Sequence, residues 1–248
     1  MLSDHEMTMV FFYHSKLFGF DGIDNKAVPY QVKKEGPSEI CYTGVQTTTK
    51  GFVIFKGPTT LINIHFKPTG FFHIFNIRPA ELVDKMGDCE DILSGEIVSL
   101  QDKMHAAGTI QEAVNILEQY LIRKMSSQNT KYRHKSISHV ADFLIKQQGM
   151  YSIKKLAYHC NMTIQTFEVQ FLEQVGINPK YFSRILRFVL ATNIKLYQPF
   201  KSWTEIANMC GYYDQAHFIK EFKEFAFVSP KKYMLTMNPI FENFEGYH

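Results

Sequence analysis

The chain has 248 residues and a hydrophobic content of 45%, enough for one large or two modest domains that each bury a core. No apolar run approaches the length of a membrane span and no signal sequence opens the chain, so we expect a cytoplasmic protein without a membrane partner. Residues 1–130 hold 12 Lys and Arg against 15 Asp and Glu, a balance of −3, whereas residues 131–248 hold 15 against 9, a balance of +6. Unless this split is a chance fluctuation of surface charge, it fits a nucleic-acid-binding module joined to a sensing or assembly module.

The N-terminal part predicts short β-strands. Runs of β-branched and aromatic residues, separated by turns that carry glycine, proline or asparagine, lie at residues 9–13, 28–32, 42–49, 52–56 and 61–66. In the last run Ile62, Ile64 and Phe66 alternate with Asn63 and His65, which is the pattern of a half-buried strand. We therefore predict a small antiparallel sheet or half-barrel.

Helices are predicted after these strands. Residues 78–86 have the pattern of a short helix with a proline in its first turn. A longer helix at residues 110–125 has Thr109 as its N-cap and Glu112 at the capping-box position. Its apolar stripe is either satisfied within the domain or a candidate homodimer surface, and consists of Ile110, Val114, Leu117, Leu121 and Met125. The polar residues 126–130 are the predicted linker, so residues 1–130 form an α+β sensing or dimerisation domain.

The sequence carries no pattern of an enzyme, a metal site or a cofactor site. There is no GxSxG motif, Walker loop or paired catalytic carboxylate motif, and the ten histidines form no HxH or HExxH spacing. The four cysteines are scattered without a CxxC pair, so we expect small buried hydrophobic residues. Six aromatic residues are either plain core or the lining of an apolar ligand pocket: Phe52, Phe55, Phe66, Phe71, Phe72 and Phe75.

Residues 202–233 predict two short helices on either side of a tight turn. Ser202 and Glu205 have the spacing of a capping box, and Gly211 can supply the positive φ that ends the first helix. Phe218, Phe222 and Phe225 form one apolar stripe on the second helix, which leaves a polar and basic face outward. This is a helix-turn-helix signature.

A weaker copy of the pattern lies about fifty residues upstream. Leu156-Ala157 matches Ile206-Ala207, Cys160 matches Cys210, and one residue is gained at the turn. Beyond the turn the matched pairs are Phe167 with Phe218, Phe171 with Phe222, and Pro179 with Pro230. A helix is predicted before this unit, from residue 137 to 145, and a connecting helix follows it, from Asn178-Pro179 to residue 197. Residues 131–238 are therefore expected to be an all-α domain with two tandem helix-turn-helix units, followed by a tail at residues 239–248.

This arrangement resembles the DNA-binding domain of the AraC/XylS family of bacterial transcription regulators, over roughly residues 136–234. In the second unit the resemblance lies in Ile206-Ala207, Gly211 to Phe218, Phe222-Lys223, Ser229-Pro230 and Tyr233. In the first unit it lies in Leu156-Ala157, Met162-Thr163, Phe167, Phe171, Gly176, Pro179, Arg187 and Ala191. Residues 44–72 also resemble uncharacterised N-terminal domains of some members. Phe227 departs from the pattern, because relatives usually carry glycine there.

The resemblance implies a sequence-specific transcription regulator whose two recognition helices enter adjacent major-groove segments of double-stranded DNA. The implied further partners are RNA polymerase, a small-molecule effector in the N-terminal domain, and a second copy of the chain. The expected DNA-binding residues are Gln165, Thr166, Glu168, Val169 and Gln170 in the first unit, Arg184 and Arg187 on the connecting helix, and Gln215, Ala216, His217, Ile219, Lys220 and Lys223 in the second unit.

These residues differ in what they can contact. Lys220 is the best candidate for a base edge or a phosphate, Gln165 and Gln215 can pair with adenine, and Arg184 and Arg187 can lie over phosphates. The face from residue 165 to 170 has no positive charge, so we expect the first unit to contribute modestly. That neutral face also motivates an alternative, in which the chain is a protein-interaction module that keeps the fold but binds DNA weakly or not at all.

Overall fold

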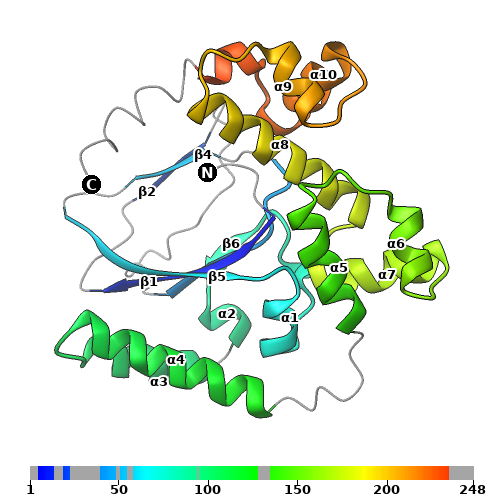
Figure 1. The fold of residues 1–248 in the computed structure, drawn as a ribbon. Helices are drawn as coiled ribbons and strands as arrows, with labels where there is room; N and C mark the ends of the chain where they lie inside the picture. The colour runs from blue at the N-terminus through cyan, green and yellow to red at the C-terminus, as the bar shows by residue number, and fades with distance from the viewer. Residues whose placement is uncertain are drawn as a thin grey trace.

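The computed structural model describes residues 5–13, 19–22, 40–48, 51–54, 58–93, 95–127 and 135–234. The strand predicted at residues 28–32, the ends of those at 42–49 and 52–56, and the tail at 239–248 lie outside the described residues. Figure 1 shows a sheet near the centre, a pair of long helices on one side of it, and the helical C-terminal part along the other. No helix in the described part is long and apolar enough to cross a membrane.

The predicted antiparallel sheet is confirmed. Its four strands, in the order β5-β1-β3-β6, are β5 (Thr60–Phe66), β1 (Met7–Tyr13), β3 (Ile40–Thr43) and β6 (Met86–Asp88), and each neighbouring pair is antiparallel. A second antiparallel pair, β2 (Gly19–Gly22) with β4 (Gly51–Ile54), is separate from it. The alternation predicted in β5 is present, since Asn63 and His65 are exposed while Phe66 is buried.

The helix predicted at residues 78–86 is wrong. Only a 3₁₀ turn, η2 (Pro79–Glu81), forms, and Met86 begins strand β6 at the edge of the sheet. Asp84 explains the difference, because its carboxylate accepts hydrogen bonds from the backbone N–H and the hydroxyl of Thr47, and its own N–H donates to Val45. These tertiary bonds draw the segment to the sheet, where it pairs with β3.

Helices cover the sheet on the side of the long helix pair: α1 (Gly70–Phe75), α2 (Glu90–Leu93), α3 (Gly95–His105) and α4 (Ile110–Ser127). The start of α4 agrees with the prediction, but the helix runs through Ser127, into the predicted linker. Its buried face is Ala113, Leu117 and Tyr120, whereas Ile110 and Met125 of the predicted stripe are 41% and 57% exposed. The cause is α3, which packs along α4 and was not predicted.

Of the six aromatic residues offered as core or pocket lining, those whose side chains the structure describes are buried or, for Phe75, half-buried. Phe66 and Phe71 are buried with their ring centroids 5.4 Å apart, and Phe75 lies 4.9 Å from Phe71. Phe72 is buried as well. Edge-to-face and tilted pairs of this kind contribute about 0.5–1.5 kcal/mol beyond the burial of their area. The side chains of residues 52 and 55 lie outside the described residues.

The C-terminal part is all helical, as predicted: α5 (Lys135–Lys146), α6 (Ile153–His159), α7 (Ile164–Val175), α8 (Pro179–Tyr197), α9 (Trp203–Met209) and α10 (Gln215–Ala226). Local sequence signals set most of their starts. Ser152, Thr163, Asn178 and Asp214 each accept a backbone N–H at a helix N-terminus, and Ser202 forms the predicted capping box with Glu205. Each such cap stabilises its helix by about 1 kcal/mol.

Phe227 ends α10 in a left-handed conformation, with φ 59°, and its side chain is 54% exposed. A residue with a Cβ pays roughly 1–2 kcal/mol for that conformation, whereas glycine adopts it freely. We therefore expect Phe227→Gly to stabilise the fold by about 1 kcal/mol in urea unfolding. Phe227→Ala should give no such gain, because alanine keeps the Cβ; equal gains from both variants would assign the effect to the exposed ring instead.

The N-terminal part contacts the helices at the junction of α7 and α8. The Tyr181 hydroxyl donates to the backbone carbonyl of Thr47 at 3.2 Å, and the rings of His5 and Phe182 lie 5.7 Å apart. Gly176, with φ 96°, ends α7 so close to Pro79 that an added Cβ would meet the proline Cβ at 2.9 Å. The sheet domain is thus packed directly on the end of one predicted recognition helix.

Candidate nucleic-acid interface

Two helix-turn-helix units with the same turn geometry lie at the two ends of α8 (Figure 1). In the first, the Met162 N–H donates to the Ala157 carbonyl at 3.0 Å; in the second, the Tyr212 N–H donates to the Ala207 carbonyl at 3.0 Å. Both alanines are buried. The left-handed turn residue is Gly211 in the second unit and Asn161 in the first. The tandem repeat expected from the sequence is therefore present.

The predicted residues of α7 and α10 lie on the outward faces of these helices. Phe167, Phe171, Phe218, Phe222 and Phe225 are all buried on the opposite faces. The exposed members of the predicted set are Gln165, Thr166, Glu168, Val169, Gln215, Ala216, His217, Lys220 and Lys223, and the half-buried ones are Gln170 and Ile219. The outward faces of α7 and α10 are therefore exposed and suited to a DNA groove. Contact of each residue with DNA stays a prediction.

Some of these side chains already have partners. The Thr166 and Thr163 hydroxyls are 2.9 Å apart, and Gln215 accepts a hydrogen bond from the Thr204 hydroxyl at 3.0 Å. The bond to Gln215 joins the first turn of α10 to α9 and orients the amide. In the described part of the chain, Lys220 has no ion-pair partner.

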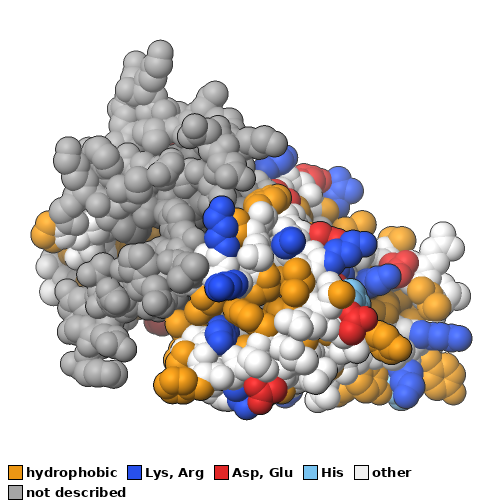
Figure 2. All heavy atoms as spheres, turned by 90° about the horizontal axis from the view of Figure 1, so that it is seen from above, with side chains coloured by type: hydrophobic (Ala, Val, Ile, Leu, Met, Phe, Trp, Pro, Cys, Tyr) orange, Lys and Arg blue, Asp and Glu red, His pale blue; other side chains and the backbone are white. Residues whose placement is uncertain are grey.

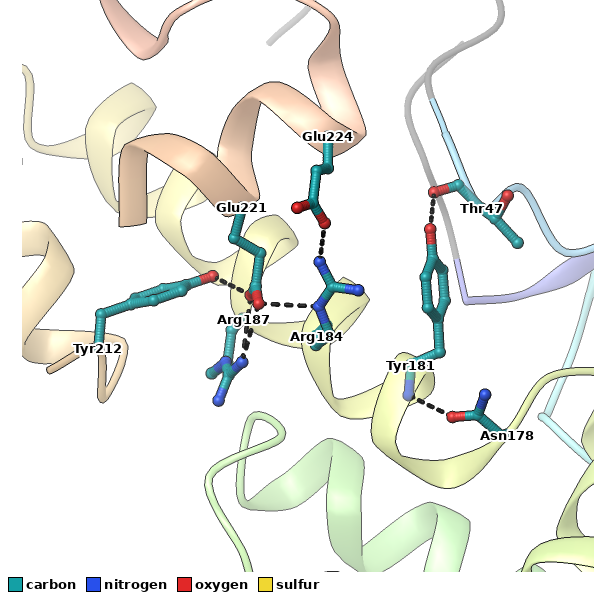
Figure 3. A network of polar contacts seen from close by, with 8 residues as sticks. All are labelled: Thr47, Asn178, Tyr181, Arg184, Arg187, Tyr212, Glu221 and Glu224. Atoms are coloured by element: carbon teal, nitrogen blue, oxygen red, sulfur yellow. Dashed lines mark hydrogen bonds and ion pairs between the residues drawn. The ribbon is translucent and has the colours of Figure 1, made fainter. Parts of the chain in front are cut away.

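Arg184 and Arg187 point at α10 rather than away from the protein (Figure 3). Arg184 Nε donates to Glu221 Oε2 at 2.8 Å, and its Nη2 pairs with Glu224. Arg187 Nη2 lies 3.1 Å from Glu221 Oε1, the same oxygen that accepts from the Tyr212 hydroxyl at 2.7 Å. The structure gives both arginines a role inside the protein, as the ties between α8 and α10; their contact with phosphates stays a prediction.

Glu221 is the centre of this network and was not among the residues expected from the sequence. Its side chain is only 6% exposed, and burial alone would raise the pKa of its carboxyl group. The hydrogen bonds from Tyr212 and Arg184 and the charge of Arg187 outweigh burial, so the pKa of Glu221 lies below its ordinary value. The sequence did contain a signal for this network. Glu221 lies three residues after Phe218, on the buried face of the helix, where a charged side chain needs a partner.

The network also fixes the ionisation of its donors. Burial would lower the pKa of Arg184, but its bonds to Glu221 and Glu224 raise it. Burial and the neighbouring Glu221 raise the pKa of the Tyr212 phenol, which therefore stays protonated and donates. A buried carboxylate with three donors around it is rigid, and here it sets the position of the second recognition helix on the connecting helix.

A hollow of about 560 Å³ lies beside the network, between the two units. Its walls are the turn before α6, the first half of α8 and the middle of α10. The charged residues that line it are Lys180, Arg184, Arg187, Lys220, Glu221 and Glu224, together with His217. Four cations against two carboxylates leave the hollow basic, which suits a phosphate backbone. Figure 2 shows Lys and Arg side chains lying between hydrophobic ones over the described part of the upper face.

Among the described residues we find neither a thiol activated as a nucleophile nor a cluster of metal-ligating side chains. Cys41, Cys89 and Cys210 are buried and Cys160 is half-buried, all as free thiols. Burial raises the pKa of Cys210 to about 12 and that of Cys160 above its ordinary value, which makes both poor nucleophiles. No group of three or more His, Cys, Asp and Glu that could hold a metal ion occurs in the described ranges.

A comparison with family models agrees with this geometry in the C-terminal part. A family model described as a helix-turn-helix domain matches residues 156–235. Solved structures of ToxT from Vibrio cholerae are similar in fold: that from strain O395 is 14% identical, with 94% of this chain and 90% of that chain covered and a TM-score of 0.45. ToxT of strain SCE256 bound to an unsaturated fatty acid is 15% identical, with 92% and 86% covered and a TM-score of 0.43. No curated protein sequence matches the chain.

Proposed function

We propose that this chain, whose residues 156–235 form an AraC-type helix-turn-helix domain, regulates transcription by reading two adjacent major-groove segments of one DNA duplex. The domain supports DNA binding in general. The adjacent grooves are our inference from two units of equal turn geometry on one rigid connecting helix. Successive major-groove segments on one face of DNA are about 34 Å apart, which is the spacing that a tandem reader must match.

The basic hollow between the units carries this proposal. Two helices that enter successive grooves have the intervening phosphate backbone between them, and the hollow offers cations at that place. Lys180 and Lys220 have no ion-pair partner among the described residues, so we assign them the first phosphate or base contacts. Arg184 and Arg187, already paired with Glu221, come second.

Selection of bound sequences from a random duplex pool tests the proposal. We expect an enriched site of two parts whose centres lie about one helical turn, roughly 10 base pairs, apart. A salt titration on random duplex then measures the non-specific part of the affinity, which should fall steeply with salt. No binding even at low salt would contradict the proposal and favour the protein-interaction module, for which the neutral face of α7 is the supporting observation.

Lys220→Ala should lower the affinity for the selected site by about 1–3 kcal/mol if Lys220 reads a base edge, because the substitution removes the cation in the middle of the α10 face. Fluorescence anisotropy on the selected site and on an unrelated duplex measures the difference. An equal loss on both duplexes would show a phosphate contact instead.

Gln165→Ala should change the preference at one base pair, because the exposed amide near the start of α7 can pair bidentately with adenine. The selection is repeated with this variant and with Gln147→Ala, which removes an exposed amide in the turn after α5. Identical profiles for wild type and Gln165→Ala would leave the first unit without a base-reading role for this residue.

The N-terminal domain is proposed to couple a signal to DNA binding in the cytoplasm. Support comes from its packing on the end of α7 and the start of α8 through Thr47, Pro79 and Tyr181, which gives a direct mechanical route to the first unit. A small-molecule effector, a second copy of the chain and RNA polymerase are its proposed partners. We propose no catalytic activity, because the helix-turn-helix domain indicates a regulator.

A further inference from the structure

A groove of about 360 Å³ runs between α3 and α4, away from the helix-turn-helix units. The two helices form an antiparallel hairpin, so the first turns of α3 face the last turns of α4. The volume lies in the range of small-molecule sites, roughly 300–1,000 Å³. Its polar lining comes from Glu96, Ser99 and Lys103 on α3 and from Tyr120, Arg123, Lys124 and Ser127 on α4.

The groove is basic. Lys103, Arg123 and Lys124 line it with a single carboxylate, Glu96, which pairs with Lys124. In the described part of the chain neither Lys103 nor Arg123 has a carboxylate partner; Arg123 donates its Nε–H to the Gln119 carbonyl at 3.3 Å. The sequence balance of residues 1–130 is acidic, so this excess of cations is a local feature of the groove and not of the domain.

Tyr120 adds a buried donor. The residue lines the groove and is 7% exposed, and its buried hydroxyl oxygen has no hydrogen-bond partner among the residues that the structure describes. Burial, with smaller contributions from Glu96 and Cys89, raises the pKa of Tyr120 to about 12, so the phenol keeps its proton at neutral pH. A buried hydroxyl with nothing to donate to costs about 1–3 kcal/mol, and a ligand oxygen that accepts from it would remove that cost.

The Glu96 carboxylate shows where a negatively charged oxygen can bind in this groove. This carboxylate pairs with Lys124, whose ammonium lies 5.8 Å from the centroid of the Tyr120 ring. Because the Glu96 side chain is 61% exposed, the pair is held weakly and an external anion can displace the carboxylate at little cost. Arg123 presents a planar fork that suits carboxylate and phosphate groups, and Leu100 gives the groove an apolar wall.

We propose that the α3–α4 groove is the binding site of a small organic anion, whose carboxylate or phosphate group replaces Glu96 at Lys124 and is held by Lys103, Arg123 and Tyr120. The ligand would clamp α3 to the last turns of α4, the helix that ends at Ser127 just before the chain continues toward α5 at residue 135. This position suits an effector. The effector role rests on the proposed regulatory function, whereas binding of the anion does not.

Isothermal titration of the full chain with citrate and with inorganic phosphate tests the site, with glycerol as the neutral control. We expect binding of at least one anion with a Kd in the millimolar range or tighter. Arg123→Gln and Tyr120→Phe should each weaken it about tenfold, which is the loss of one charge-assisted or buried hydrogen bond. Glu96→Gln should strengthen binding, because it removes the internal competitor.

The matched control is Lys146→Gln, which removes one positive charge from an exposed residue at the end of α5 and should leave the Kd unchanged. No binding of either anion, an equal loss in Lys146→Gln, or weaker binding by Glu96→Gln would each overturn the proposal. Thermal unfolding confirms that every variant is folded. Failure of DNA binding both with and without the anion would contradict the regulatory function alone, since the titration contains no DNA.

Discussion

Glu221→Gln should destabilise the fold by about 3–5 kcal/mol, although the side chain keeps its size and one hydrogen-bond acceptor. The glutamine leaves Arg184 and Arg187 beside a neutral group in a place where the side chains of both arginines are only 21% exposed. Removing one member of a buried ion network costs more than the network contributes, because the remaining charges stay desolvated without compensation. Urea unfolding followed by circular dichroism measures the change.

The matched control for this prediction is Glu224→Gln. Glu224 pairs with the same Arg184, but its side chain is 48% exposed and water replaces the lost contact. We expect a change of about 0–1 kcal/mol. If the two variants were equally destabilised, the buried position of Glu221 would not be the cause, and the network would be no more than a surface ion pair.

The pH dependence provides an independent check of the same network. Because the folded protein lowers the pKa of Glu221 below the ordinary value of 4.5, the unfolded chain takes up the proton first as the pH falls. The stabilisation by Glu221 is therefore complete above about pH 4.5 and is lost as the pH falls through the lower folded pKa. Glu221→Gln should lack this part of the acid destabilisation, and parallel curves of stability against pH for both proteins would contradict it.

Local signals in the sequence were sufficient for the C-terminal helices. The capping box of Ser202 and Glu205, the Asn178-Pro179 start of α8 and the turn glycine Gly211 are short-range features, and each forms as predicted. The outward placement of the residues expected on α7 and α10 also agrees with helical periodicity, since the buried phenylalanines lie on the opposite faces. These parts could be predicted because their determinants lie within one or two turns of the residue concerned.

The fold of the N-terminal domain and the ion network were harder to predict from the sequence, because their determinants lie far apart in the chain. The segment after Arg78 extends to a sheet edge because Asp84 bonds to Thr47, 37 residues away. Glu221 meets Arg187 across a separation of 34 residues, and a pattern of apolar positions does not pair charges on different helices. The buried face of α4 likewise depends on α3, which packs along it. In each case a contact with a residue distant in the sequence decides the structure, and the local spacing of residues carries no information about that contact.

Gly149→Ala should destabilise the fold by about 3 kcal/mol through the contact that joins the two helix-turn-helix units. Gly149, in the turn after α5, has φ 75°, and an added Cβ would stand 2.2 Å from the backbone carbonyl oxygen of Ser183 on α8. The turn must move away from the connecting helix to accept the methyl group. The next residue, Met150, reaches Gly211 in the turn of the second unit, so this movement alters how the first unit is seated against the second.

Gly211→Ala is the matched control. Its φ is 72°, nearly that of Gly149, but the added Cβ would meet only the sulfur and Cγ of Met150, at 3.3 and 3.4 Å. A flexible side chain can yield where a backbone cannot, so we expect about 1–2 kcal/mol, the cost of the left-handed conformation alone. Urea unfolding of both variants measures the difference, and equal losses would show that the contact with Ser183 relaxes freely.

Gly149→Ala and Gly211→Ala also test whether the two helix-turn-helix units bind DNA in a fixed arrangement. If DNA affinity depends on a fixed placement of α7 relative to α10, then Gly149→Ala should weaken binding to the two-part site by more than Gly211→Ala does, at temperatures where both are folded. A duplex that contains only the part read by the second unit should bind wild type and Gly149→Ala equally, because the ties of α10 to α8 through Glu221 do not involve residue 149. Equal weakening on both duplexes would mean that the turn supports the second unit itself, and that the tandem arrangement adds no fixed spacing.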